Sequence, residues 1–176
     1  MITPEEFLKT ELENYNLGFN STQFVALAKA TINQLKSLPI KTVLDYGAGT
    51  GVYTDQAYKA GYDVKAFEIW KEHRDYVFKH APYIQFVSEP VTTDLLMFIE
   101  TAEHMTDKEL NDLFKSISPT YVLFSSTSNK TDNDEAWGHI NVKPQEEWLK
   151  KFKEWGYKLQ EDLKAPTQWT KLFKRV

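Results

Sequence analysis

The sequence VLDYGAGTGVYTD, residues 43–55, places three glycines at alternate positions directly after a short apolar run that ends in an acid. Glycine has no Cβ, so Gly47, Gly49 and Gly51 can adopt positive φ and let a ligand approach the main chain. A helix that begins directly after such a turn offers free backbone amides to the same ligand. The stretch therefore predicts a strand, a ligand-binding turn and a helix.

Segments on both sides continue this alternation. Short apolar runs predict seven strands, at 41–46, 62–69, 83–87, 94–100, 121–126, 157–162 and 168–176. Helical spacing and capping residues predict helices that begin at Thr3 and span 20–38, 51–60, 71–81, 107–117 and 144–155. We expect an α/β fold: a doubly wound, Rossmann-like, mostly parallel seven-stranded sheet with one antiparallel edge strand and helices on both faces.

Length and composition limit the organisation of the chain. The 176 residues show no repeat or linker, so we expect a single domain, 1–176, with an N-terminal helical cap at 1–38 and a core at 40–176. The absence of cysteine excludes disulfides and thiolate metal sites. A net charge of -4 disfavours a general nucleic-acid binder. Without a membrane-length apolar run or a signal pattern, we expect a cytoplasmic protein with no membrane partner.

The glycine spacing distinguishes between nucleotide ligands. A dinucleotide-binding G-x-G-x-x-G would need its third glycine at Val52, so a nicotinamide enzyme is disfavoured. Glu68 ends the second strand, where a carboxylate can accept both hydroxyls of a ribose. Trp70, two residues later, could lie flat on an adenine ring. These residues predict a site for an adenosine-containing ligand.

The motif D45-Y-G-A-G-T-G51, the acid Glu68 and the strand order together resemble class I S-adenosylmethionine-dependent methyltransferases, over roughly residues 40–176. The resemblance implies S-adenosyl-L-methionine as cofactor, with the glycine loop around its methionine and ribose and the acid on the ribose hydroxyls. These cofactor-binding roles fall on Asp45, Gly47, Gly49, Gly51 and Glu68. For the adenine contact after the third strand, the candidates are Ser88 and Glu89.

A second motif follows the fourth strand. FIETAEHM, residues 98–105, gives Glu100, Glu103 and His104 an E-x-x-E-H spacing, and in a helix residues i, i+3 and i+4 share a face. His139, in a later polar loop, could supply a fourth metal ligand. Two carboxylates and two imidazoles suit Mn²⁺, Co²⁺, Fe²⁺ or Mg²⁺. In many methyltransferases of this class, however, a Glu-His pair here only holds the loop and lines the pocket.

The full motif is similar to two metal-dependent branches of the family, the plant-type small-RNA 2′-O-methyltransferases and the O-methyltransferases of ubiquinone synthesis. A bound metal would lower the pKa of the attacking hydroxyl and orient it. Without metal, His104 or His139 becomes the candidate general base. We expect His73 and His80 at the surface, with no role.

Several functions fit these residues. The first is methyl transfer to a hydroxyl oxygen of a small molecule; the others are 2′-O-methylation of a terminal RNA nucleotide, a non-catalytic cofactor-binding module, and an aminopropyl transferase with DNDE, 132–135, on a polyamine. The polar loop at 125–143 is expected to close over the substrate, with Trp137 stacked on the acceptor or packed in the fold. The first helix, with Phe7 and Tyr15, either covers the cofactor or packs on the sheet. The oligomeric state stays open.

Overall fold

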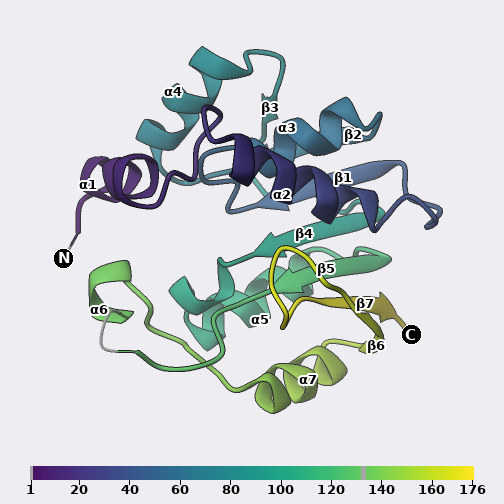
Figure 1. Ribbon diagram of the computed structural model, residues 1–176. Coiled ribbons are helices and arrows are strands. Elements are labelled where there is room, and N and C mark those ends of the chain that lie inside the picture. Colours follow the sequence, from purple (N-terminus) through teal and green to yellow (C-terminus); the bar gives the residue numbers. More distant parts are fainter. Residues whose placement is uncertain (1, 132–133) are drawn as a thin grey trace.

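The computed structural model describes residues 2–131 and 134–176, which form one seven-stranded sheet in the order β3-β2-β1-β4-β5-β7-β6 (Figure 1). The strand order reverses between β1 and β4, and ligands of open α/β sheets bind outside the strand ends at such a point. The strands are β1 Thr42–Tyr46, β2 Asp63–Phe67, β3 Gln85–Phe86, β4 Leu95–Ile99, β5 Tyr121–Ser125, β6 Tyr157–Asp162 and β7 Lys171–Arg175.

The sheet is mostly parallel, as the sequence predicts. Strands β1 to β5 pair in parallel, and β7 pairs antiparallel with both β5 and β6. The last two strands therefore form the expected antiparallel pair at one edge, with β7 one place in from that edge. This arrangement follows from burial, because Leu172 and Phe173 of β7 are buried whereas β6 exposes nearly all its side chains.

Helices cover both faces of the sheet (Figure 1). One core cluster joins the sheet to α5 Asp107–Ser116 and α7 Gln145–Glu154, and the other joins it to α2 Thr22–Asn33 and α3 Val52–Lys59. The remaining elements are α1 Pro4–Lys9, the π-helix η1 Thr10–Asn14, α4 Lys71–His80, the 3₁₀ turn η2 Ala102–His104 and α6 Asp134–Trp137. Among the described residues, no helix is long and apolar enough to cross a membrane.

Two helix starts follow the predicted capping chemistry. Thr3 with Glu6, and Thr106 with Glu109, each form a complete capping box at the start of α1 and α5. The helix expected at 20–38 is shorter, because α2 ends at Asn33 and turns continue to residue 38. The expected loop at 125–143 contains the one-turn helix α6, while residues 132 and 133 of the DNDE sequence lie outside the described residues.

Candidate active site

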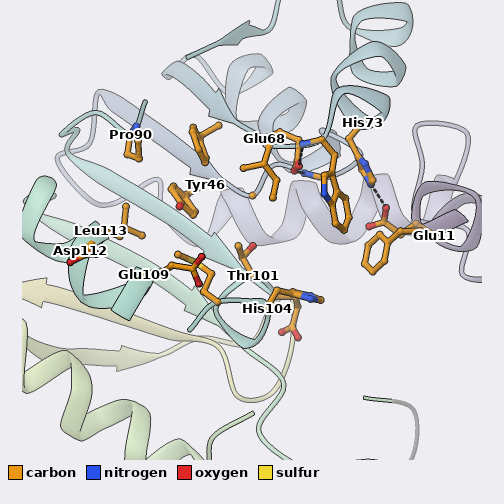
Figure 2. Close-up of a pocket in the computed structure, with 18 of the residues that line it drawn as sticks. Glu11, Tyr46, Glu68, His73, Pro90, Thr101, His104, Glu109, Asp112 and Leu113 are labelled. Carbon is orange, nitrogen blue, oxygen red and sulfur yellow. Dashed lines mark hydrogen bonds and ion pairs between the residues drawn. The ribbon is translucent and has the colours of Figure 1, made fainter. Parts of the chain in front are cut away.

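A cavity of about 550 Å³ opens beside the carboxyl ends of the central strands (Figure 2). Its lining comes from the glycine turn after β1, the end of β2, the segment after β4, and the helices α1, α4 and α5. The lining residues that bear on chemistry are Glu11, Gly47, Gly49, Glu68, Trp70, His73, Glu100 and His104. The structure thus brings the two sequence motifs to one cavity.

The three glycines have different neighbours, although all adopt positive φ. A Cβ on Gly47 would lie 2.5 Å from the Thr101 side chain, and one on Gly51 would lie 2.6 Å from Cγ2 of Val77. These two glycines therefore let neighbouring segments pack closely. Gly49 is open, since the nearest atom to its Cβ position is Oε1 of Glu11 at 3.8 Å. Only at Gly49 does the glycine leave space for a ligand.

Glu68 ties the end of β2 to the glycine turn. Its Oε2 accepts from the Gly49 amide at 2.9 Å and its Oε1 from the Trp70 amide at 2.9 Å. Each carboxylate oxygen has a second lone pair, so the group can still accept the hydroxyls of a ribose. The Trp70 ring also lines the cavity, and it contacts Phe7 edge-on at 5.0 Å. The open glycine, the acceptor carboxylate and the aromatic ring fit an adenosine-type cofactor.

Asp45 lies beneath the turn and does not line the cavity. Its buried carboxylate accepts from the Thr54 hydroxyl at 2.5 Å, which joins β1 to α3. Burial raises the pKa of Asp45 to about 7, against the opposing effect of the Thr54 hydrogen bond. The Ser88 and Glu89 side chains also lie outside the lining, where Pro90 is the residue present. Asp45 therefore supports the turn from below.

The E-x-x-E-H segment forms a 3₁₀ turn instead of the expected α-helix. Glu100 has a φ of 46°, and its carboxylate accepts from the Ser125 hydroxyl, from the Thr127 hydroxyl at 2.9 Å and from Trp169 Nε1 at 3.3 Å. Glu103 is fully buried and accepts from the Ser126 hydroxyl at 2.9 Å. Side chains at the end of β5 and directly after it therefore hold both carboxylates.

The loop that carries His139 is held against this turn. The carbonyl oxygen of Glu103 accepts from the amides of Ile140 and Asn141, both at 2.9 Å. The ring centroids of His104 and His139 are 4.8 Å apart, and ligand atoms of Glu103, His104 and His139 all lie within 4.8 Å of one another. Glu100 lies outside this set. Three of the four predicted metal ligands thus converge.

Electrostatics make this cluster suited to a cation. Burial raises the pKa of Glu103 well above its ordinary value, and the neighbouring Glu100 charge raises it further. Burial, followed by the charge of His139, lowers the pKa of His104 to about 4. His104 is therefore neutral at pH 7 and offers a lone pair. A carboxylate with two imidazoles is a donor set for a borderline divalent ion.

The sequence did not predict two residues of the cavity wall, Glu11 and His73. His73 was expected at the surface, which is wrong: it is only 1% exposed, lines the cavity, and its Nε2 lies 2.6 Å from Oε2 of Glu11. The N-terminal segment covers it, and no local sequence signal predicts a contact over 62 residues.

His80 is exposed, as expected. Trp137 packs on Phe7 and Tyr15, at centroid distances of 5.4 and 4.6 Å.

The strand order, the glycine turn and the acid after β2 are features of class I S-adenosylmethionine-dependent methyltransferases. The methyltransferase domain family matches residues 19–175, and the chain belongs to this family. The predicted family, the enzyme class and S-adenosylmethionine as cofactor are thereby confirmed. A search of curated proteins gave no significant match.

Solved structures show the same fold. Magnesium protoporphyrin IX methyltransferase from Synechocystis PCC 6803 with bound SAH has a TM-score of 0.72 at 14% identity, over 98% of this chain and 97% of that one. The DhpI-SAM-HEP complex has a TM-score of 0.67 at 14% identity, over 98% and 95%. The pyocyanin biosynthetic protein PhzM has a TM-score of 0.66 at 14% identity; the match covers 98% of this chain but only 61% of PhzM.

Proposed function

We propose that the enzyme transfers the methyl group of S-adenosylmethionine to a hydroxyl oxygen of a small molecule, assisted by a divalent cation at Glu103, His104 and His139. The observation that carries this proposal is the convergence of these three donor groups, one of which, His104, lines the same cavity as the glycine turn and Glu68. We further propose that residues 1–176 act as one domain, with 1–38 as a helical cap on the core at 40–176.

One half of the cavity, formed by the glycine turn, Glu68 and Trp70, is the cofactor half and would position the methyl donor. The cofactor supplies a methyl group already activated on a sulfonium sulfur, so no covalent enzyme intermediate is needed. Glu68 would accept the ribose hydroxyls, Gly49 leaves room for the chain of the cofactor, and Trp70 offers a ring for the adenine. These contacts would hold the donor in the cavity that His104 also lines.

The cluster of Glu103, His104 and His139 is the histidine half of the site and would bind and activate the acceptor hydroxyl. When bound, a cation would act as a Lewis acid that lowers the pKa of that hydroxyl. His139 Nδ1 is 3.0 Å from Oδ1 of Asp134, which fixes the ring orientation. His104, kept neutral, and His139 are also the candidate bases that would accept the hydroxyl proton.

The charge of the cavity favours a small acceptor over an RNA terminus. Its lining includes the carboxylates of Glu11, Glu68, Glu100, Glu109 and Asp112, and none of the described lining residues is lysine or arginine. Phosphates of RNA would be repelled by this surface, because phosphate recognition relies on cationic side chains. A neutral or cationic hydroxylated molecule suits it better.

The test is Mn²⁺ binding together with methyl transfer to a panel of small hydroxylated acceptors, with and without EDTA. We expect Glu103→Ala, His104→Ala and His139→Ala each to weaken Mn²⁺ binding by roughly tenfold or more, and EDTA to abolish transfer. His80→Ala, at an exposed histidine, is the matched control and should behave as wild type. Wild-type Mn²⁺ affinity in all three variants would refute the metal site, and cofactor binding without transfer to any acceptor would favour a non-catalytic module.

A further inference from the structure

Glu11 places a carboxylate directly above the glycine turn. It belongs to the π-helix η1, which continues α1, and such helices often occur at functional sites. Its Oε1 is the nearest atom to the open side of Gly49, and its Oε2 lies 2.6 Å from Nε2 of His73 (Figure 2). Glu11 precedes the part of the chain, 19–175, that the methyltransferase family matches.

His73 makes the hydrogen bond that holds this carboxylate. The imidazole is buried on α4 between the rings of Phe7 and Trp70, at centroid distances of 6.1 and 5.3 Å. Its Nδ1 is buried and has no hydrogen-bond partner among the described residues, so the contact with Glu11 is the one hydrogen bond its ring makes there. A buried polar atom without a partner costs about 1–3 kcal/mol.

The chain around Glu11 is fastened to the cofactor-binding elements. The Glu11 carbonyl accepts from the Leu17 amide at 2.8 Å, and the Leu17 carbonyl accepts from the Thr50 hydroxyl at 2.6 Å. The hydroxyl of Tyr76, on α4, accepts from the Phe19 amide at 3.2 Å. The segment that carries the carboxylate is therefore held by the Thr50 hydroxyl of the glycine turn and by the Tyr76 hydroxyl of α4.

Glu11 differs from Glu68 and Glu100, the other two glutamates near the glycine turn and the E-x-x-E-H segment, because one of its oxygens accepts no hydrogen bond from the described residues. Both oxygens of Glu68 accept from backbone amides, and both oxygens of Glu100 accept from side chains. Oε1 of Glu11 accepts from no group in the described parts of the chain. A fixed anion with one free oxygen suits an ammonium group, whose N–H donors pair with carboxylates. The sulfonium of the cofactor has no such donor.

We propose that Glu11 binds the ammonium group of the amino-acid part of S-adenosylmethionine, and that His73 is the residue that positions Glu11. This inference rests on the proposed cofactor site. It predicts that Glu11 affects the affinities of three ligands differently. S-adenosylmethionine and S-adenosylhomocysteine share the ammonium group, whereas methylthioadenosine retains the nucleoside but lacks the amino acid. Loss of the carboxylate should weaken the first two alone.

Calorimetric titration of the full chain with these three ligands tests the proposal. We expect Glu11→Gln to weaken binding of S-adenosylmethionine and S-adenosylhomocysteine by roughly tenfold or more, and to leave methylthioadenosine within about twofold. Glu13→Gln, at an exposed acid of the same π-helix, should change none of the three. His73→Phe should reproduce the Glu11→Gln pattern, and His73→Gln, which retains an N–H donor, should restore part of the affinity.

Three outcomes would overturn the inference: no change in Glu11→Gln, an equal loss for methylthioadenosine, or a loss for S-adenosylmethionine alone. Thermal unfolding of each variant identifies any effect that comes from a damaged fold. A wild-type protein that binds none of the three ligands would refute the cofactor site itself, and the ammonium contact with it. Wild-type binding with an unchanged Glu11→Gln would refute the ammonium contact alone.

Discussion

The two halves of the cavity use their acids differently. In the cofactor half, Glu68 accepts from the amides of Gly49 and Trp70, 19 and 2 residues away. In the histidine half, Glu103 is fully buried beside a second carboxylate and accepts from side chain and backbone of the segment after β5. The first acid is satisfied by local backbone. The second is an acid whose pKa burial raises, so a proton or a bound cation would compensate its charge.

This difference indicates separate tasks. An acid whose oxygens accept from backbone amides can use its remaining lone pairs to hold a neutral group such as a ribose. A fully buried carboxylate beside a second carboxylate costs free energy until a positive charge or a proton neutralises it. The two halves therefore differ in how their acids are compensated, which fits the separate tasks of cofactor binding and acceptor activation that we propose for them.

The largest effect is expected at Glu68. Glu68→Ala removes both amide contacts and the acceptor for the ribose, so we expect S-adenosylhomocysteine affinity to fall at least about a hundredfold, from two charge-assisted hydrogen bonds of roughly 1.5 kcal/mol each. Calorimetry measures this loss. Glu72→Ala, at an exposed acid on α4, is the control and should bind as wild type. Unchanged affinity in Glu68→Ala would show that the two halves do not differ as described.

The cofactor half could be predicted because its signals are local. The glycine turn lies between a strand and a helix that the sequence already predicts, and Glu68 ends the next strand. The mostly parallel sheet followed from the same alternation of strand and helix. The E-x-x-E-H residues were also identified as candidate metal ligands, and that role stays a prediction. Their geometry was not predicted, because a 3₁₀ turn and the Glu103 carbonyl bring His139 near. Tertiary hydrogen bonds of that kind leave no periodic pattern.

The cavity wall shows where prediction from sequence fails. Glu11 and His73 lie on separate helices, 62 residues apart, and no motif in the sequence connects the two. Their contact depends on how α1 lies across α4, which packing of Phe7 against Trp70 and His104 helps to fix. Such an arrangement follows from three-dimensional packing of aromatic rings. The expected surface position of His73 was therefore wrong.

A comparison within the cofactor half separates packing from binding. Gly51→Ala should lower the free energy of unfolding by roughly 2 to 3 kcal/mol, because its Cβ would lie 2.6 Å from Val77 at a φ of 76°. Gly49→Ala has open space, so we expect only about 1 kcal/mol from its positive φ, with weaker S-adenosylhomocysteine binding. Urea unfolding and calorimetry measure the two effects. Equal destabilisation by both substitutions would contradict this division.

The smallest effect concerns Asp45, the buried acid beneath the cofactor half. Its folded-state pKa, raised to about 7 by burial, exceeds the value near 3.9 of an unfolded aspartate, so the folded state binds the extra proton between these values. Stability is therefore lost as pH rises through this window. Asp45→Asn removes that loss and can still accept from Thr54. Measured by urea unfolding, the free energy of unfolding of Asp45→Asn relative to wild type should therefore rise by roughly 2 kcal/mol between pH 5 and pH 8. Asp63→Asn, at the exposed start of β2, is the control and should show no such rise. A difference between Asp45→Asn and wild type that does not depend on pH would mean that the Asp45 carboxylate stays ionised from pH 5 to pH 8.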